Sequence, residues 1–133
     1  MKVLNLIIRQ KYFDAILAGR KAQEFREVRP TNIKKLLQLD EEGYEVEDEE
    51  GNAQPIKYDA IQFYVGYNKD RDSALVEVAG AHCEIFVNNN GEPITYEYGR
   101  DKEGKPLVWV AEQVVYDLGK ILNHNIREKS KKV

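Results

Sequence analysis

The sequence has a single cysteine and no long apolar run. Cys83 has no second cysteine to pair with, and small secreted domains usually contain several, so a reducing, cytoplasmic location is expected. The first apolar stretch, within residues 1–9, is shorter than a signal-peptide core with its flanks and far shorter than the ~20 residues of a membrane span. We therefore expect a soluble protein without a membrane segment.

Motifs for metals, cofactors and covalent catalysis are also missing. His82 and Cys83 are adjacent, so on a strand they point to opposite faces, and His124 is remote in sequence; no zinc spacing exists. There is no glycine-rich phosphate loop and no nucleophile elbow. We expect neither a metal nor a cofactor.

Charge is distributed very unevenly along the chain. The net charge is −3, but residues 1–37 carry +6, residues 38–59 carry −8, residues 60–119 carry −5 and residues 120–133 carry +4. A negative total is unusual for a nonspecific binder of duplex DNA, although a polarised molecule can still present one positive face. Binding to duplex DNA is therefore not expected, whereas a local anion site remains possible.

The composition that is present fits one globular domain. A chain of 133 residues that is 42% hydrophobic can bury a sizeable core without disulfides or metals. We predict a single domain over residues 1–126, followed by a flexible basic tail over residues 127–133.

Two short helices are predicted near the N-terminus. The first lies between two strands, and the second follows the second of these strands. Residues 3–9 form an apolar strand, residues 10–18 have helical spacing ended by Gly19, and residues 21–28 are again extended. Thr31 or Asn32 caps a second helix. One core is predicted from the following apolar positions: Leu6, Ile8, Phe13, Leu17, Phe63 and Val65.

The rest of the chain is predicted to be β-structure with several hairpins. Three loops share the order Gly, Pro, apolar residue, around Gly51, Gly91 and Gly104. The fold class is therefore α+β, mainly β. A closed or nearly closed barrel disposes of exposed sheet edges, and a two-sheet sandwich is the competing architecture. The acidic residues 40–50 are interpreted as a solvated flap.

The segment with the most chemical information is residues 19–26. Glu24 and Arg26 share one side of the predicted strand, and Lys21 at the corner before it is long enough to reach the same cleft. Two cations and a carboxylate could converge there. The alternative is an ordinary surface ladder pair with Lys21 in solvent.

The run from Gly19 to Arg26 resembles the G-x-K-x-x-E-x-R signature of the ASCH family, and the flanking strand, helix and residues 115–122 resemble that family too. The resemblance implies a PUA-like β-barrel whose cleft binds RNA or a nucleotide-like ligand. One branch of the family hydrolyses acylated cytidines with a lysine, a threonine and a glutamate. Lys21 matches that lysine, but Glu24 stands at the threonine position, and residues 88–100 replace the stretch that contains the third residue.

A second candidate patch is the polar loop of residues 66–72. Tyr67 offers a face for base stacking and Arg71 a contact for phosphate. Trp109, Tyr96 and Tyr98 are better explained by core or cross-strand packing.

Three functions follow from these residues. The first is a binding domain for single-stranded or structured RNA, or a modified nucleotide, that uses Lys21, Glu24, Arg26, Tyr67 and Arg71. The second is a metal-independent amidohydrolase acting on N-acylated cytidine-type nucleosides, with Lys21 and Glu24 as catalytic residues. A carboxylate beside Lys21 favours its charged form, which is the wrong form for a nucleophile. The third is a protein-interaction module that uses the acidic flap.

Overall fold

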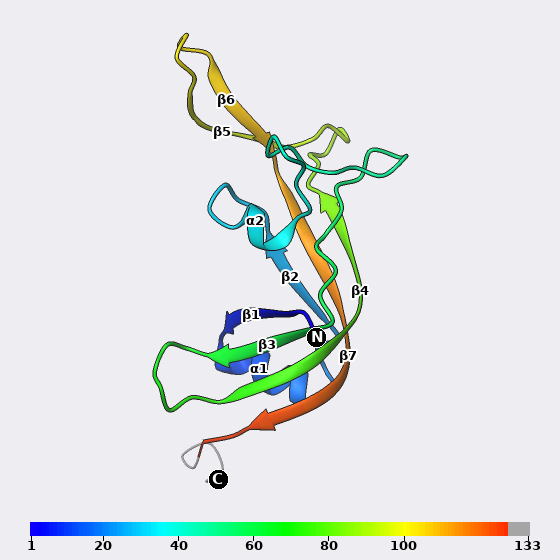
Figure 1. The fold of residues 1–133 in the computed structure, drawn as a ribbon, viewed down its shortest axis with the longest axis vertical. Coiled ribbons are helices and arrows are strands. Elements are labelled where there is room, and N and C mark those ends of the chain that lie inside the picture. Colours follow the sequence, from blue (N-terminus) through cyan, green and yellow to red (C-terminus); the bar gives the residue numbers. More distant parts are fainter. Residues whose placement is uncertain (128–133) are drawn as a thin grey trace. The chain divides into compact units, whose positions relative to one another are not determined.

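The computed structural model describes residues 1–127, so most of the predicted basic tail lies outside the described residues. The fold is mainly β with two helices, which confirms the predicted α+β class. The elements in chain order are β1 (Val3–Ile8), α1 (Gln10–Leu17), β2 (Gln23–Glu27), α2 (Ile33–Leu36), β3 (Ala60–Val65), β4 (Ser73–Ile85), β5 (Thr95–Arg100), β6 (Pro106–Val110) and β7 (Glu112–Asn125) (Figure 1). Among residues 1–127, no helix is both long enough and apolar enough to cross a membrane.

Contacts divide the chain into two compact units. The first unit is built from Met1–Glu24, Lys57–Ala81 and Tyr116–Val133, and the second from Phe25–Ile56 and His82–Val115. The long strands β4 and β7 pass from one unit into the other. Whether the two units fold as the single domain expected from the chain length stays a prediction.

The larger sheet has the strand order β1-β3-β4-β7-β2. β1 pairs with β3 in parallel, with Leu6 opposite Phe63, and β3 pairs with β4 in antiparallel, with Ile61 opposite Val76. Because β1 and β2 end the order and no pairing between them is found in the described residues, the sheet is not seen to close. Barrel closure stays a prediction.

The core of the first unit forms where α1 contacts β3. Four of the six predicted core side chains are buried, namely Leu6, Ile8, Phe13 and Phe63. Leu17 and Val65 are only half-buried. Ile16 and Leu17 were both expected on the inner face of the helix, but only Ile16 is buried. Val65 lies at the end of β3, just before the loop that starts at Gly66.

The end of α1 has the predicted left-handed glycine. Gly19 has φ of 77°, the backbone N–H of Arg20 donates to the carbonyl of Ala15, and that of Gly19 donates to the carbonyl of Ile16. This pair of hydrogen bonds is a Schellman motif, which a glycine at this position permits without strain. The chain then bends sharply enough for Lys21 to donate its own N–H to Ala15.

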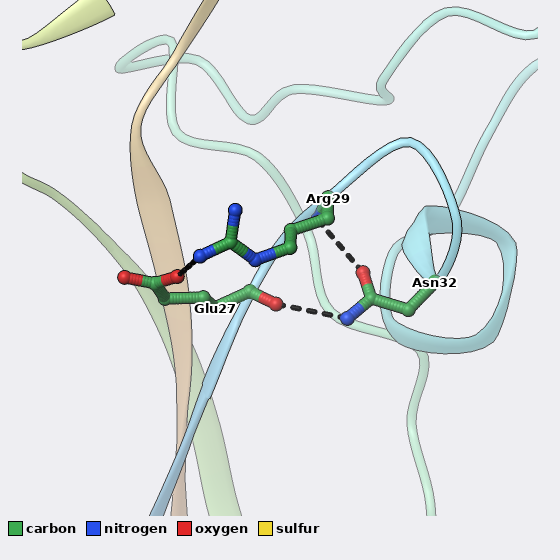
Figure 2. A network of polar contacts seen from close by, with 3 residues as sticks. All are labelled: Glu27, Arg29 and Asn32. Atoms are coloured by element: carbon green, nitrogen blue, oxygen red, sulfur yellow. Dashed lines mark hydrogen bonds and ion pairs between the residues drawn. The ribbon is translucent and has the colours of Figure 1, made fainter. Parts of the chain in front are cut away.

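In the second unit, β2 and α2 are joined by a short polar network (Figure 2). The side chain of Asn32 accepts a hydrogen bond from the N–H of Arg29 at 2.8 Å and donates to the carbonyl of Glu27 at 2.9 Å. The Arg29 guanidinium pairs with the Glu27 carboxylate. Asn32 occupies the predicted cap position of α2, but its side chain stabilises the preceding turn and not the helix N-terminus.

Four tight turns of one kind follow in this unit. In each, an Asp or Asn side chain accepts the N–H groups of the second and fourth residues after it, and a glycine stands at the third; the four begin at Asp40, Asp48, Asn88 and Asp101. Three are the predicted hairpin loops. The turn at Asp40 belongs to the segment interpreted as an acidic hairpin forming a solvated flap, and its likeness to the other three turns was not predicted.

The four turns belong to two similar junctions. Around Gln38, Val46 and Gln54, three backbone hydrogen bonds form a closed ring, because each residue donates to one neighbour and accepts from the other. Phe86, Ile94 and Ala111 form a second ring of the same connectivity. The two acidic turns therefore lie in an ordered arrangement of main-chain bonds.

The hairpin of β5 and β6 holds its aromatic residues by cross-strand packing, as predicted. Tyr96 lies opposite Trp109, with ring centroids 5.7 Å apart, and Tyr98 packs against the same indole at 4.8 Å. These rings contribute to the hairpin and give no reason to place a ligand there.

Candidate functional site

Lys21 lies at the irregular corner between α1 and β2, as the sequence predicts. Its Nζ is 3.6 Å from Oε1 of Glu24, and the two side chains are only 18% and 8% exposed. The ammonium also lies 5.5 Å from the centroid of the Tyr12 ring. Lys21 is therefore held in place, which differs from the solvent-exposed position of the alternative interpretation.

A cavity of about 420 Å³ opens beside this corner, within the first unit. Gly19, Lys21 and Ala22 form one side of it, and β7 contributes a second cation, Lys120. The remaining lining is mostly apolar: Ile16, Leu17, Val76, Leu118 and Ile121, together with Gly119. Two cations around an apolar floor suit a ligand that has a flat or apolar body and a negative group.

The cavity arises from the way the chain leaves the sheet. The N–H of Leu118 donates to the carbonyl of Ala22 at 2.9 Å, immediately before β2 begins. One residue earlier, Lys21 donates to Ala15 and so belongs to the end of α1. Within the described part of the chain, β7 continues beyond Leu118 while the segment before Ala22 turns away into α1. The space between the end of α1 and this part of β7 is the cavity.

Gly119 lines the cavity at a position where a side chain would not fit without displacing Glu77. A Cβ on Gly119 would meet the Glu77 side chain, with the Cβ of Glu77 at 3.3 Å and its carboxylate closer still. Nearby, Gln23 donates to the carboxylate of Asp117 at 2.7 Å. The carboxylates of Glu77 and Asp117 thus lie near Gly119, but neither residue lines the cavity. The charged residues of the lining are both lysines, Lys21 and Lys120.

Arg26 belongs to the second unit, so the cavity is described without it. Along β2, Glu24 is buried and Arg26 half-buried, whereas Gln23, Phe25 and Glu27 are exposed, which confirms that Glu24 and Arg26 share a strand side. Neither lines the cavity. The predicted convergence of Lys21, Glu24 and Arg26 is thus found for the first two residues and remains a prediction for Arg26.

The second predicted patch is not adjacent to Lys21. Arg71 donates to the carbonyl of Gly66 at 2.8 Å and stacks 4.1 Å from the centroid of the Tyr64 ring, so it stabilises its own loop. Tyr67 is 86% exposed. This loop is joined to the start of α1, whereas Lys21 follows its end, and an eight-residue helix separates them by roughly 12 Å.

Asp72 is the link between that loop and α1, and sequence reasoning missed it. Its carboxylate is 1% exposed and accepts hydrogen bonds from the Gln10 side chain and from the Arg127 N–H, both at 3.0 Å. A buried carboxylate with such partners is costly to leave unsatisfied, so it fixes the loop and the end of β7. Arg127 is therefore anchored, although it was assigned to the flexible tail.

The second unit contains a cluster of acidic residues near Cys83. Burial, a hydrogen bond with Glu45 and the charges of Glu45 and Glu47 raise the pKa of Glu112 to about 8. Burial together with Glu112 and Glu45 raises the pKa of the Cys83 thiol to about 12, which disfavours a reactive thiolate. Among residues 1–127, no group of three His, Cys, Asp or Glu side chains is arranged to hold a metal ion.

Comparison of the chain with protein-family models, with curated proteins and with solved structures finds no match. The resemblance to the ASCH family therefore rests on the residues quoted for it, and the site is interpreted from its own geometry.

Proposed function

We propose that this chain is a binding domain for a nucleotide-like ligand, either a free nucleotide or the end or loop of an RNA, with the ligand held in the cavity beside Lys21. The observation that supports it is the position of the cavity: the segment predicted from sequence to bind the ligand supplies Gly19, Lys21 and Ala22 to its lining. Its volume of about 420 Å³ lies within the range of small-ligand pockets.

Each part of the cavity has a role in this proposal. Ile16, Leu17 and Ile121 give an apolar surface against which a base packs, while Lys21 and Lys120 contact the phosphate. Glu24, which does not line the cavity, acts on the ligand only through the Lys21 ammonium that it holds in position.

The finer assignment to a PUA-like barrel of the ASCH family belongs to the same proposal. It is supported by the G-x-K-x-x-E-x-R run, by the order strand, helix, strand at its start, and by the cavity at that run. In this proposal, Arg26, Tyr67 and Arg71 take secondary roles, as contacts for a longer RNA that extends beyond the cavity.

Titration calorimetry with nucleoside monophosphates, the matching nucleosides and a short single-stranded RNA tests the proposal. Lys21→Ala and Lys120→Ala should weaken binding of the monophosphates more than binding of the nucleosides, because only the former contain phosphate. Lys102→Ala, an exposed lysine in a tight turn of the second unit, is the matched control and should change nothing. With RNA, each lost phosphate contact should lower the salt-dependence slope by about 0.7. Equal affinity of parent and both cavity variants would contradict the proposal.

A measurement of hydrolysis distinguishes the amidohydrolase alternative from the binding proposal. We expect no release of carboxylate from N4-acetylcytidine, since Glu24 supplies a carboxylate where the hydrolytic branch has a hydroxyl and is paired with Lys21. Release that disappears in Lys21→Ala but persists in Lys102→Ala would replace the binding proposal by the enzymatic one.

A further inference from the structure

Among residues 1–127, no strand lies beside one side of the last part of β7. β2 pairs with β7 from Glu112, which accepts the N–H of Val28, to Leu118, which donates to Ala22. These two bonds define an antiparallel register that ends at Leu118, because the chain before Ala22 turns into α1. Residues 119–125 of β7 therefore extend beyond β2 and have β4 on one side only.

The register also tells which main-chain groups face the open side. Along a strand, the N–H and C=O of alternate residues point to the same neighbour. Since Glu112 and Leu118 bond toward β2, the residues that point the same way farther along are Lys120, Leu122 and His124. Ile121 and Asn123 point toward β4. All side chains of residues 119–125 are exposed.

We propose that this open edge of β7 binds an extended acidic peptide, which adds to the sheet as a further strand. Main-chain hydrogen bonds to Lys120, Leu122 and His124 provide the affinity, as in other cases of strand addition. Leu122, which is 44% exposed, offers an apolar contact on the same face as Lys120 and His124. The edge shares Lys120 with the cavity of the nucleotide proposal. The inference does not rest on that proposal, because it is argued from main-chain groups and concerns a different ligand.

The acidic character of the partner follows from the charges along the edge. From Gly119 to Arg127, the charged and titratable side chains are all basic: Lys120, His124 and Arg127. Arg127 is paired with Asp72, whereas Lys120 and His124 are exposed at the edge. Carboxylates at two peptide positions four residues apart lie opposite these two residues. The one opposite Lys120 forms a cross-strand pair of opposite charge, which stabilises a sheet, and the one opposite His124 can accept a hydrogen bond from the imidazole.

A second copy of this chain fits the same edge less well. Antiparallel pairing of two copies about Leu122 would place Lys120 of each chain opposite His124 of the other. Neither side chain offers the other a carboxylate, so this pairing lacks the opposite-charge pair that an acidic peptide gives Lys120. Natural proteins protect exposed edges with charges in this way, so the edge is better suited to a peptide of opposite charge than to self-association.

Hydrogen exchange with a defined peptide tests the proposal. The probe is acetyl-Thr-Glu-Thr-Val-Thr-Glu-Thr-amide, in which the two Glu side chains lie opposite Lys120 and His124 and the Val side chain lies opposite Leu122. It is added at about ten times its Kd. The amides of Lys120, Leu122 and His124 should then exchange about 10-fold more slowly, whereas those of Ile121 and Asn123, already facing β4, should change little. This period of two is the signature of strand addition and would not arise from a merely electrostatic contact.

Two controls address the main-chain and the charge contributions. The same peptide methylated on its main-chain nitrogens should not bind, and one with Lys in place of Glu should bind at least ~10-fold more weakly. Lys120→Glu should weaken binding of the acidic peptide, while Lys102→Glu, a matched charge reversal in the second unit, should not.

Four outcomes would overturn the inference: no binding of the acidic peptide, binding without the alternating protection, equal binding of the methylated peptide, or the same protection produced by raising the concentration of the protein alone. The last of these would assign the edge to a second copy of the chain.

Discussion

The ammonium of Lys21 and the carboxylate of Glu24 form an ion pair 3.6 Å apart at the corner where α1 ends and β2 begins. The carboxylate side chain is 8% exposed, so it depends on such partners to compensate for the water it has lost. Glu24 therefore contributes to stability and, through the same ion pair, holds the Lys21 ammonium beside the cavity.

Removing the charge of Glu24 should lower stability. Glu24→Gln keeps the shape but removes the anion that compensates Lys21, and we expect a loss of ~1–3 kcal/mol in the free energy of unfolding. Glu27→Gln is the matched control on the same strand, because Glu27 is exposed and pairs with exposed Arg29; its effect should stay below ~0.5 kcal/mol. Urea unfolding of both variants makes the comparison, and equal losses would contradict a special role for Glu24.

Two adjacent residues of α1 should respond differently to truncation. Ile16 is 5% exposed and belongs to the core, so Ile16→Ala should cost ~2–5 kcal/mol. Leu17 is half-buried at the cavity wall, so Leu17→Ala should cost less and should instead enlarge the cavity. Denaturation midpoints measure both losses. A larger loss for Leu17→Ala would mean that α1 is rotated from the described position.

Glu112 should make stability depend on pH. Its pKa in the folded state is raised to about 8 from an ordinary value of 4.5, by burial first and then by Glu45 and Glu47. Between these two values, the folded state keeps a proton that the unfolded state releases, so this contribution to stability falls as the pH rises from about 4.5 to about 8.

Glu112→Gln removes that titration and should flatten the fall in stability over the same range. Glu92→Gln, an exposed carboxyl in a tight turn, should leave the pH profile of the parent unchanged. Thermal unfolding across this range of pH provides the measurement, and a profile of Glu112→Gln that parallels the parent would contradict the assignment.

A methyl group at Gly119 should disturb the wall of the cavity. Because the new Cβ would meet the Glu77 side chain, Gly119→Ala should destabilise the protein by ~1–3 kcal/mol. Glu77→Ala removes the carboxylate end of that contact, so the double variant should recover part of the loss. Strict additivity of the two single effects in chemical denaturation would show that the residues do not interact.

The sequence predicts the N-terminal elements well because their signals are local. The apolar run of β1, the helical spacing of α1 and the glycine at position 19 each specify a structure within a few residues, and all three elements are found where they were predicted. Both faces of β1 were expected to be largely buried, but only the face of Leu4, Leu6 and Ile8 is buried. The turns at Gly51, Gly91 and Gly104 are likewise local and are found where they were predicted.

The parts that the sequence did not predict depend on pairings between distant residues. Lys120 reaches the cavity only through the register of β7 against β2, nearly 100 positions earlier in the chain. Asp72 is explained by partners at Gln10 and Arg127, and no local pattern indicates either. Arg71 has the residue type expected for phosphate, but its guanidinium is bound to Gly66 and stacked on Tyr64.

The proposal that the cavity beside Lys21 binds a nucleotide-like ligand is tested most directly by mapping a nucleotide on the protein by NMR. We predict that cytidine monophosphate shifts the amide signals of Gly19, Lys21, Gly119 and Lys120, that the shifts saturate, and that Lys120→Ala weakens the binding measured from them, while the signals of residues 66–72 stay unchanged. Saturating shifts confined to residues 66–72, or no saturable shift at millimolar nucleotide, would contradict the account.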